Sequence, residues 1–189
     1  MNITSARFVK GVVAKDKTLE DGKPQIAFIG RSNVGKSSTI NAILNRKDLS
    51  RISSSPGRTA QINLFLINES FYFVDLPGYG YAKKSQQERT ELQELINWYL
   101  FGQNYKHKKI VLIIDAFTGP SGDDIDLLEA MEEEKLPVLI IANKIDKIKS
   151  SVRKNHLKEL EEMFPGEKII FYSTQTKAGL DELRKEVLK

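Results

Sequence analysis

Short apolar runs alternate with amphipathic stretches along most of the chain. The apolar runs are typical of buried strands and predict them at 25–29, 62–67, 71–75, 110–115, 137–142 and 168–172. Apolar residues with helical spacing predict helices at 36–44, 86–100, 122–134, 151–163 and 179–188. The pattern contains no internal repeat and no low-complexity linker.

Only Asn68-Glu69-Ser70 separates the second predicted strand from the third. That connection is too short for a parallel crossover, so these strands should form an antiparallel hairpin. Helices join the other strands. We therefore predict an α/β fold with three αβα layers, in which a six-stranded, mostly parallel sheet has one antiparallel edge strand.

The first 24 residues are polar and rich in basic side chains, namely Arg7, Lys10, Lys15, Lys17 and Lys23. They suit either a strap or a mobile arm, and the pattern does not distinguish the two. We expect residues 1–24 to form this basic N-terminal segment and residues 25–189 to form a single domain.

Composition excludes several classes of protein. The chain has no Cys, which rules out disulfides, a thiol nucleophile and a Cys-based zinc site. His107 and His156 lie in Lys-rich segments and are expected at the surface. No apolar run is long enough to span a membrane, and the N-terminus lacks the apolar core of a signal peptide. We expect a cytoplasmic monomer that does not bind a membrane.

Charge is segregated along the chain. The net charge is +4, yet residues 121–134 carry seven acids and no Lys or Arg. The rest of the chain is therefore strongly basic, which suits an RNA-facing protein, although ordinary solubility explains it equally well. The acidic stretch is expected to be the solvated face of one helix.

A glycine-rich loop follows the first predicted strand. Residues Gly30-Arg31-Ser32-Asn33-Val34-Gly35-Lys36-Ser37 match the GxxxxGKS pattern and lead into a predicted helix. In such a loop the backbone N–H groups and the helix N-terminus bind phosphates. Lys36 is expected to contact the β- and γ-phosphates, and Ser37 to offer a hydroxyl to Mg²⁺. A glycine-rich turn with an incidental lysine is the alternative, but the order of strand, loop and helix favours a phosphate site.

Asn143-Lys144-Ile145-Asp146 follows another predicted strand. Asp146 could accept hydrogen bonds from N1–H and the 2-amino group of guanine, whereas adenine would leave a buried carboxylate unpaired. Alone, this tetrapeptide could be a surface turn. Its position downstream of a phosphate loop predicts a GTPase. The backbone N–H groups of Ser173-Thr174-Gln175, after the last predicted strand, could reach guanine O6.

Asp75-Leu76-Pro77-Gly78 ends the third predicted strand, at the edge where open α/β sheets bind ligands. We expect Asp75 to hold Mg²⁺ through water and the Gly78 N–H to meet the γ-phosphate, with a simple strand-ending turn as the alternative. The segment from Ser53 to Thr59 should order on the nucleotide, with Thr59 as the second hydroxyl on Mg²⁺. This stretch and the segment after Gly78 would be the two switches.

The motifs at 30–38, 56–59 and 75–82 together resemble those of the EngB family, also called YsxC, which are bacterial GTPases related to the Era and TrmE groups. The resemblance runs from about Phe8 to the C-terminus. It departs from the family pattern at Asn143, where Thr is common, and at Thr174-Gln175. The resemblance implies a Ras-like P-loop NTPase fold, GTP and Mg²⁺ as ligands, a role in assembling the large ribosomal subunit, and a requirement in normal cell division and septation.

The resemblance also implies the residues of the site. Lys36 and Thr59 would be the catalytic residues, and Ser37 and Thr59 the direct Mg²⁺ ligands. The GTP site would consist of Gly30, Arg31, Ser32, Asn33, Val34, Gly35, Lys36, Ser37, Gly57, Arg58, Thr59, Ala60, Gln61, Asp75, Leu76, Pro77, Gly78, Asn143, Lys144, Ile145, Asp146, Tyr172, Ser173 and Thr174.

The usual catalytic side chain is absent. A Ras-type site orients the attacking water with a glutamine after the DxxG glycine, and this chain has Tyr79 there. Hydrolysis is therefore expected to be slow without K⁺ or a ribosomal partner. In related GTPases an asparagine at the position of Asn33 coordinates a stimulating K⁺, so the resemblance suggests K⁺ here; a loop-stabilising hydrogen bond is the alternative.

Basic residues surround the two switch segments and are interleaved with Tyr79 and Tyr81: Arg46, Lys47, Arg51, Arg58, Lys83, Lys84 and Arg89. This face suits the phosphates and stacked bases of rRNA, although basic loops are often only solvated and tyrosines can pack on their own helix. We expect a GTP-driven switch that binds the large ribosomal subunit or its precursor, through rRNA and ribosomal proteins. A GTP-binding scaffold with negligible turnover, acting through division proteins, is the alternative.

Overall fold

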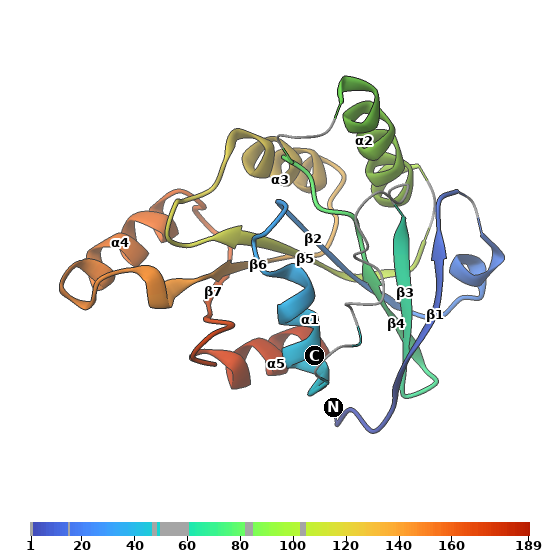
Figure 1. Cartoon of the computed structure of the whole chain (residues 1–189), viewed down its shortest axis with the longest axis horizontal. Helices are drawn as coiled ribbons and strands as arrows, with labels where there is room; N and C mark the ends of the chain where they lie inside the picture. The colour runs from blue at the N-terminus through green and yellow to red at the C-terminus, as the bar shows by residue number, and fades with distance from the viewer. Residues whose placement is uncertain (1, 15, 47–48, 50–60, 82–84, 103–104) are drawn as a thin grey trace.

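The computed structural model contains a seven-stranded sheet flanked by helices (Figure 1). It describes residues 2–14, 16–46, 49, 61–81, 85–102 and 105–189. The strands are β1 (Ala6–Val12), β2 (Gln25–Gly30), β3 (Ile62–Ile67), β4 (Phe71–Asp75), β5 (His107–Asp115), β6 (Val138–Asn143) and β7 (Ile169–Phe171). The helices are α1 (Lys36–Leu44), α2 (Gln86–Phe101), α3 (Gly122–Glu133), α4 (Ser150–Glu162) and α5 (Leu180–Leu188), and short 3-10 helices lie at Lys17–Glu20 and Ile145–Lys147.

The sheet has the strand order β1-β3-β4-β2-β5-β6-β7. Strands β4, β2, β5, β6 and β7 run parallel, whereas β3 is antiparallel to both β4 and β1. The predicted α/β class and the hairpin after Ile67 are confirmed. Two details of the prediction are wrong. The sheet has seven strands instead of six, because β1 joins it. The antiparallel strand β3 lies inside the sheet and not at its edge.

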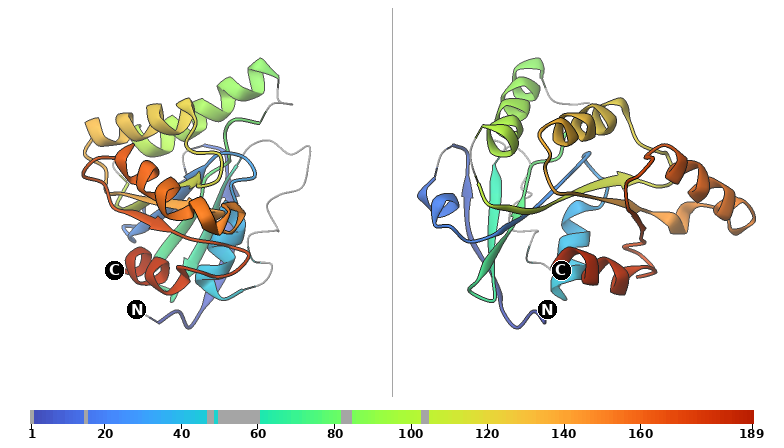
Figure 2. Two further views of the ribbon diagram at one scale, coloured as in Figure 1. Left: turned by 90° about the vertical axis from the view of Figure 1, so that its left-hand side faces the viewer. Right: turned by 180° about the vertical axis from the view of Figure 1, so that it is seen from behind.

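Each face of the sheet is covered by helices, as two views show (Figures 1 and 2). One core cluster joins α2, α3 and α4 to strand residues such as Ala27 and Ile29. The other joins α1 and α5 to their neighbours on the opposite face, such as Ile26 and Phe28. The side chains of β2 are buried on both faces, which explains why this strand is a continuous apolar run.

The N-terminal segment contributes an edge strand that the sequence analysis did not predict. Strand β1 pairs with β3 from Ala6 opposite Ile67 to Val12 opposite Ile62, with an irregularity between Phe8 and Lys10. After it, Leu19 is buried, and its carbonyl accepts a 2.8 Å hydrogen bond from Gln25 Nε2. Residues 6–12 are therefore part of the sheet.

His107 differs from the expectation of an exposed side chain. It lies at the start of β5, 5.1 Å from the ring of Tyr99 by centroids, and burial lowers the pKa of its imidazole. His156 is half-buried, with Nε2 2.7 Å from the carbonyl oxygen of Ala116. Over the residues described, no helix is long and apolar enough to cross a lipid bilayer.

Candidate functional site

The glycine-rich loop connects the end of β2 to the start of α1, as the sequence predicts. Gly35 caps α1 with φ 100°, a conformation that favours glycine, and a Cβ at this position would collide with the side-chain amide of Asn143. Asn33 is also left-handed, with φ 64°, and its side chain is exposed. The loop thus has the backbone bend that turns successive N–H groups toward one centre.

Lys36 and Asp75 meet beside this loop. Asp75 ends β4, which lies next to β2 with Phe28 opposite Asp75. The Lys36 ammonium forms an ion pair and hydrogen bond with Asp75 Oδ1, and both side chains are nearly buried. The structure therefore brings the lysine expected at the phosphates together with the carboxylate expected near Mg²⁺.

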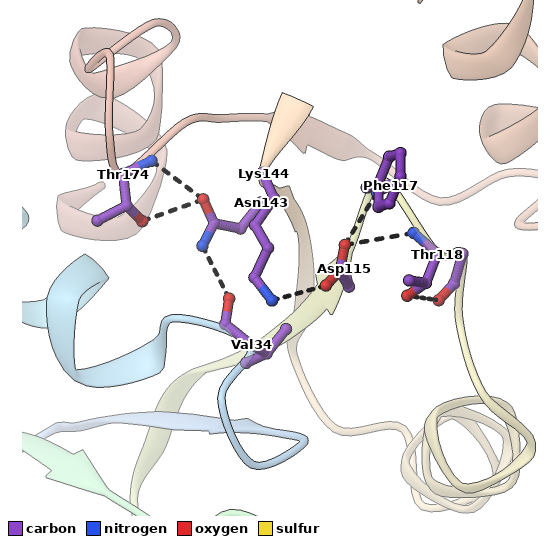
Figure 3. A network of polar contacts seen from close by, with 8 residues as sticks. Val34, Asp115, Phe117, Thr118, Asn143, Lys144 and Thr174 are labelled. Atoms are coloured by element: carbon purple, nitrogen blue, oxygen red, sulfur yellow. Dashed lines mark hydrogen bonds and ion pairs between the residues drawn. The ribbon is translucent and has the colours of Figure 1, made fainter. Parts of the chain in front are cut away.

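Asn143, the last residue of β6, is buried and joins three segments (Figure 3). Its Nδ2 donates to the carbonyl of Val34 in the glycine-rich loop at 2.8 Å. Its Oδ1 accepts from the backbone N–H and the hydroxyl of Thr174, at 3.1 and 3.0 Å. This side chain therefore holds the phosphate side of the site to both base-side segments.

Lys144 makes a second bond at the same sheet edge. Its φ of 71° turns the chain, and its ammonium lies 2.7 Å from Asp115 Oδ2 at the end of β5 (Figure 3). The other oxygen of Asp115 accepts from the N–H groups of Phe117 and Thr118, at 2.9 and 3.3 Å. Asp115 is not among the predicted site residues, although its place at the carboxyl end of a buried strand was a usable signal.

Asp146 and Ser173 lie opposite each other on the base side. The Ser173 hydroxyl donates to Asp146 Oδ1 at 2.5 Å and accepts from the Thr176 N–H at 3.0 Å. The backbone N–H of Ser173 donates to the carbonyl of Ala178, and that of Thr174 to Asn143. A bond from either of these two N–H groups to guanine O6 would therefore compete with a bond within the protein.

Tyr79 lies where Ras-type sites have a catalytic glutamine, and its hydroxyl is occupied. It donates to Asp124 Oδ1 at 2.5 Å, and burial together with this carboxylate raises the pKa of the phenol. The Tyr79 carbonyl accepts a 2.7 Å bond from the N–H of Ser32 in the glycine-rich loop. Because only 6% of Tyr79 is exposed, this tyrosine packs within the protein, which was one of the two alternatives; Tyr81, which is 41% exposed, is compatible with stacking on RNA bases.

Some predicted site residues lie elsewhere or cannot be placed. Gly57, Arg58, Thr59 and Ala60 fall outside the described residues, as do Lys47, Arg51, Lys83 and Lys84 of the basic face. Gln61 donates to Asn63 Oδ1 at 3.0 Å, and its side chain lies against Gly11 of β1. Tyr172 is fully buried in the core cluster beneath α1 and α5.

Comparisons with known proteins agree with this geometry. A family model described as "50S ribosome-binding GTPase" matches residues 25–144. A probable GTP-binding protein EngB from Acholeplasma laidlawii is 42% identical over 187 residues, spanning 98% of this chain and 97% of the relative. Its namesake from Clostridium acetobutylicum is 44% identical over 186 residues, spanning 97% and 92%.

Solved structures share the fold. The crystal structure of a probable GTP-binding protein engB superposes with a TM-score of 0.73 at 22% identity, over 87% of this chain and 96% of that one. Aquifex aeolicus Era bound to GDP and AlF₄⁻ gives a TM-score of 0.66 at 29% identity, over 88% of this chain and 56% of that one. Era bound to MgGDPNP and a segment of 16S ribosomal RNA gives 0.64 at 26% identity, over 88% and 56%.

The curated relatives match nearly the whole chain at an identity far above chance, and their shared name describes GTP binding. The chain therefore belongs to the EngB family of GTP-binding proteins, and it is a GTPase of that family.

Proposed function

We propose that this protein is a GTP-driven switch that binds the large ribosomal subunit or its precursor in the cytoplasm and leaves after hydrolysis. The observation that carries the nucleotide part is the Asn143 side chain, which links the phosphate loop to both base-side segments. The ribosomal part is supported by the "50S ribosome-binding" description of the matching family model. Cells that lack the protein would be short of ribosomes, and the protein would therefore be required for normal cell division and septation.

The protein binds GTP and Mg²⁺ with the residues expected from the sequence. Lys36 neutralises the β- and γ-phosphates, and the loop N–H groups bind their oxygens. Mg²⁺, a hard ion that takes oxygen ligands, suits the hydroxyls of Ser37 and Thr59 and, through water, the Asp75 carboxylate. The Lys36–Asp75 pair supports this assignment, because it places a carboxylate within reach of the phosphate loop. The related Era structure contains Mg²⁺ with a GTP analogue.

The switch in this proposal is a rearrangement of the site when GTP binds. The N–H of Ser32 is bonded to Tyr79, and Lys36 to Asp75, so both phosphate-loop groups already have partners within the protein. An incoming γ-phosphate would compete for the Ser32 N–H and the Lys36 ammonium, and Mg²⁺ would draw on the Asp75 carboxylate. Loss of the Ser32–Tyr79 bond would then change the arrangement of the segment after Gly78. The family's GTPase activity then returns the site to the first arrangement.

RNA contributes to the ribosomal contact in this proposal. The chain outside residues 121–134 is strongly basic, and Era, a structural relative, has been solved with a segment of 16S rRNA. Arg46 and Tyr81, both exposed, lie near the ends of the two switch segments and suit a phosphate and a base, respectively. In this proposal the protein acts as a monomer with one GTPase domain.

A GTP-binding scaffold with negligible turnover is the second candidate. The observation that favours it is the Tyr79–Asp124 bond, because the side chain in the usual glutamine position cannot orient water while it is held there. Turnover that stays at background even with large ribosomal subunits would favour the scaffold. Turnover stimulated by subunits would favour the switch.

K⁺ bound through Asn33 would supply the missing charge stabilisation. Asn33 is exposed on the phosphate loop, and its φ of 64° suits Asn or Gly. Asn33→Gly therefore removes the amide without straining the backbone, which makes it a better test than Asn33→Ala. We expect wild type to hydrolyse GTP faster in K⁺ than in Na⁺ and Asn33→Gly to lose that difference. An unchanged K⁺ response would exclude Asn33 as a ligand.

Co-sedimentation with purified large ribosomal subunits tests the main proposal. The protein is mixed with subunits in GDP or a non-hydrolysable GTP analogue across a salt series. We expect binding in the GTP state that weakens steeply with salt, because contacts to phosphates release counterions. Absence of binding in both nucleotide states would contradict the ribosomal part while leaving the GTPase intact.

A further inference from the structure

A groove between α2 and α3 lies outside the nucleotide site. Both helices cover the same face of the sheet (Figure 1), and the groove between them has a volume of about 1110 Å³. This volume is slightly above the range of about 300–1000 Å³ that is usual for small-molecule sites. Its floor is apolar and includes the buried side chains of Leu92, Ile96 and Leu127.

The rim of the groove is acidic. Among the described residues, Glu94 on α2 and Asp123 and Asp126 on α3 line it, against one basic lining residue, Arg89. Helix α3 belongs to the stretch 121–134, which carries seven acids and no Lys or Arg in a chain of net charge +4. Among the described residues that line the groove, the sign of the charge is thus opposite to that of the protein as a whole, and it would attract Lys and Arg.

One end of the groove is bonded to the phosphate loop. Tyr79, Gly80 and Tyr81 form that end, and the carbonyl of Tyr79 accepts the 2.7 Å bond from Ser32. The hydroxyl of Tyr79 bonds to Asp124 in the first turn of α3. If nucleotide binding displaces Ser32, Tyr79 should move with it. The groove residues next to Tyr79 would then shift relative to α3.

We propose that this groove docks a basic polypeptide segment that inserts one or two large apolar side chains between α2 and α3, and that the nucleotide controls its affinity. The proposal rests on the proposed function in one respect: the natural source of such a segment is a protein of the large ribosomal subunit. Apolar side chains fill the floor, and flanking Lys or Arg side chains pair with Glu94, Asp123 and Asp126.

Charge reversals with matched controls test the groove. Asp126→Lys on α3 and Glu94→Lys on α2 each change an exposed groove residue. Glu132→Lys on α3 and Glu91→Lys on α2 make the same charge change at exposed positions that do not line it. The probes are the proteins of the large subunit extracted free of RNA, and separately its protein-free rRNA. Binding is measured in GDP and in a non-hydrolysable GTP analogue.

We expect wild type and both control variants to bind the protein fraction, more tightly in one nucleotide state than in the other. Each groove variant should bind it at least about ten-fold more weakly, which corresponds to roughly 1.4 kcal/mol, with GTP affinity unchanged in all four variants. Equal losses in groove and control variants, or no binding of the protein fraction by wild type in either state, would overturn the proposal. Groove variants that change rRNA binding instead would show that RNA occupies the groove.

Intact subunits separate this proposal from the proposed function. If wild type co-sediments with subunits and all four variants do so equally, the ribosomal function stands and the groove proposal fails. If wild type does not co-sediment in either nucleotide state, the ribosomal function fails, and the result with the isolated protein fraction alone decides the groove. Because the two groove variants lie on different helices, the test still holds if one of them fails to fold.

Discussion

At the scale of single residues, the base side of the site depends on one short contact between two side chains. Asp146 Oδ1 accepts the Ser173 hydroxyl at 2.5 Å, which fixes the carboxylate relative to the last loop. Ser173 is itself fully buried and held by Thr176 and Ala178. The carboxylate is therefore oriented before a base arrives, which reduces the entropy lost on binding.

Asp146→Asn should change the preferred base. The new amide presents a donor where xanthine has its C2 oxygen, and it no longer accepts two bonds from guanine. We expect affinity for GTP to fall on the order of a hundred-fold or more and affinity for xanthosine triphosphate to rise, as measured by titration calorimetry. Ser173→Ala is the control, because it keeps the carboxylate and should weaken GTP without changing the preference. An unchanged preference in Asp146→Asn would remove this residue from the base site.

Tyr79→Phe should separate a structural role from a catalytic one. The variant removes the hydroxyl that bonds to Asp124, and a hydrogen bond to a charged group contributes about 1.5–3 kcal/mol. We therefore expect a lower free energy of unfolding in urea and unchanged GTP hydrolysis without ribosomes. Tyr81→Phe, at an exposed position, should leave both quantities unchanged. A ten-fold loss of hydrolysis at unchanged stability would instead assign Tyr79 to the chemistry.

The sequence predicted where the segments of the candidate site lie but not the links among them. Local spacing was enough to place the glycine-rich loop between β2 and α1 and Asn143 to Asp146 at the end of β6. Asp115 was missed because its partner, Lys144, is distant in the sequence. The burial of Tyr79 stayed open because its partner, Asp124 on α3, is distant as well. Such pairs become neighbours only through the strand order, which the local pattern does not contain.

At the scale of elements, strand β1 shows where a pattern of apolar and polar residues fails. Its sequence from Ala6 to Val12 includes Arg7, Lys10 and Gly11, and most of its side chains are half-buried. An edge strand needs only one neighbour and tolerates charge, which protects its free edge from pairing with other chains. The strands predicted correctly, such as β2, are buried throughout and are continuous apolar runs.

The start of α5 depends on a glycine that can be tested against a matched position. Gly179 caps this helix with φ 78°, and a Cβ there would collide with the carbonyl of Phe171 in β7. Gly119 has φ 77° but has nothing within 4 Å of such a Cβ. Gly119→Ala should therefore cost only the backbone strain of about 1–2 kcal/mol, and Gly179→Ala distinctly more, in urea unfolding. Equal losses of unfolding free energy in the two variants would mean that β7 moves away from the new Cβ at no cost in stability.

At the scale of the whole molecule, buried phenols make the fold sensitive to alkali. Burial raises the pKa of five of the six tyrosines, and it raises that of Tyr72 from 10.0 to about 12 with help from the bond to Asp21. A raised pKa in the folded state means that the folded protein holds the proton more tightly than the unfolded chain. The stability from this source is complete below pH 10 and is lost as the pH rises toward 12.

Urea unfolding at a series of pH values from 9 to 12 checks this expectation. The free energy of unfolding of wild type should fall across that range, and that of Tyr72→Phe should fall less steeply, because one of the titrating groups is gone. Tyr81→Phe is the control for removal of an exposed phenol and should follow wild type. Parallel curves for wild type and Tyr72→Phe would contradict the role of Tyr72.

The three bonds of Asn143 have a consequence for a chain that is still being synthesised. Val34, Asn143 and Thr174 leave the ribosome far apart in time, since the first two are 109 positions apart in the sequence. A nascent chain that already displays the phosphate loop would lack the proposed pocket for the base until residue 174 has emerged and β7 has joined the sheet. On that proposal, a chain without residues 143–174 binds GTP more weakly than one in which the three bonds of Asn143 have formed.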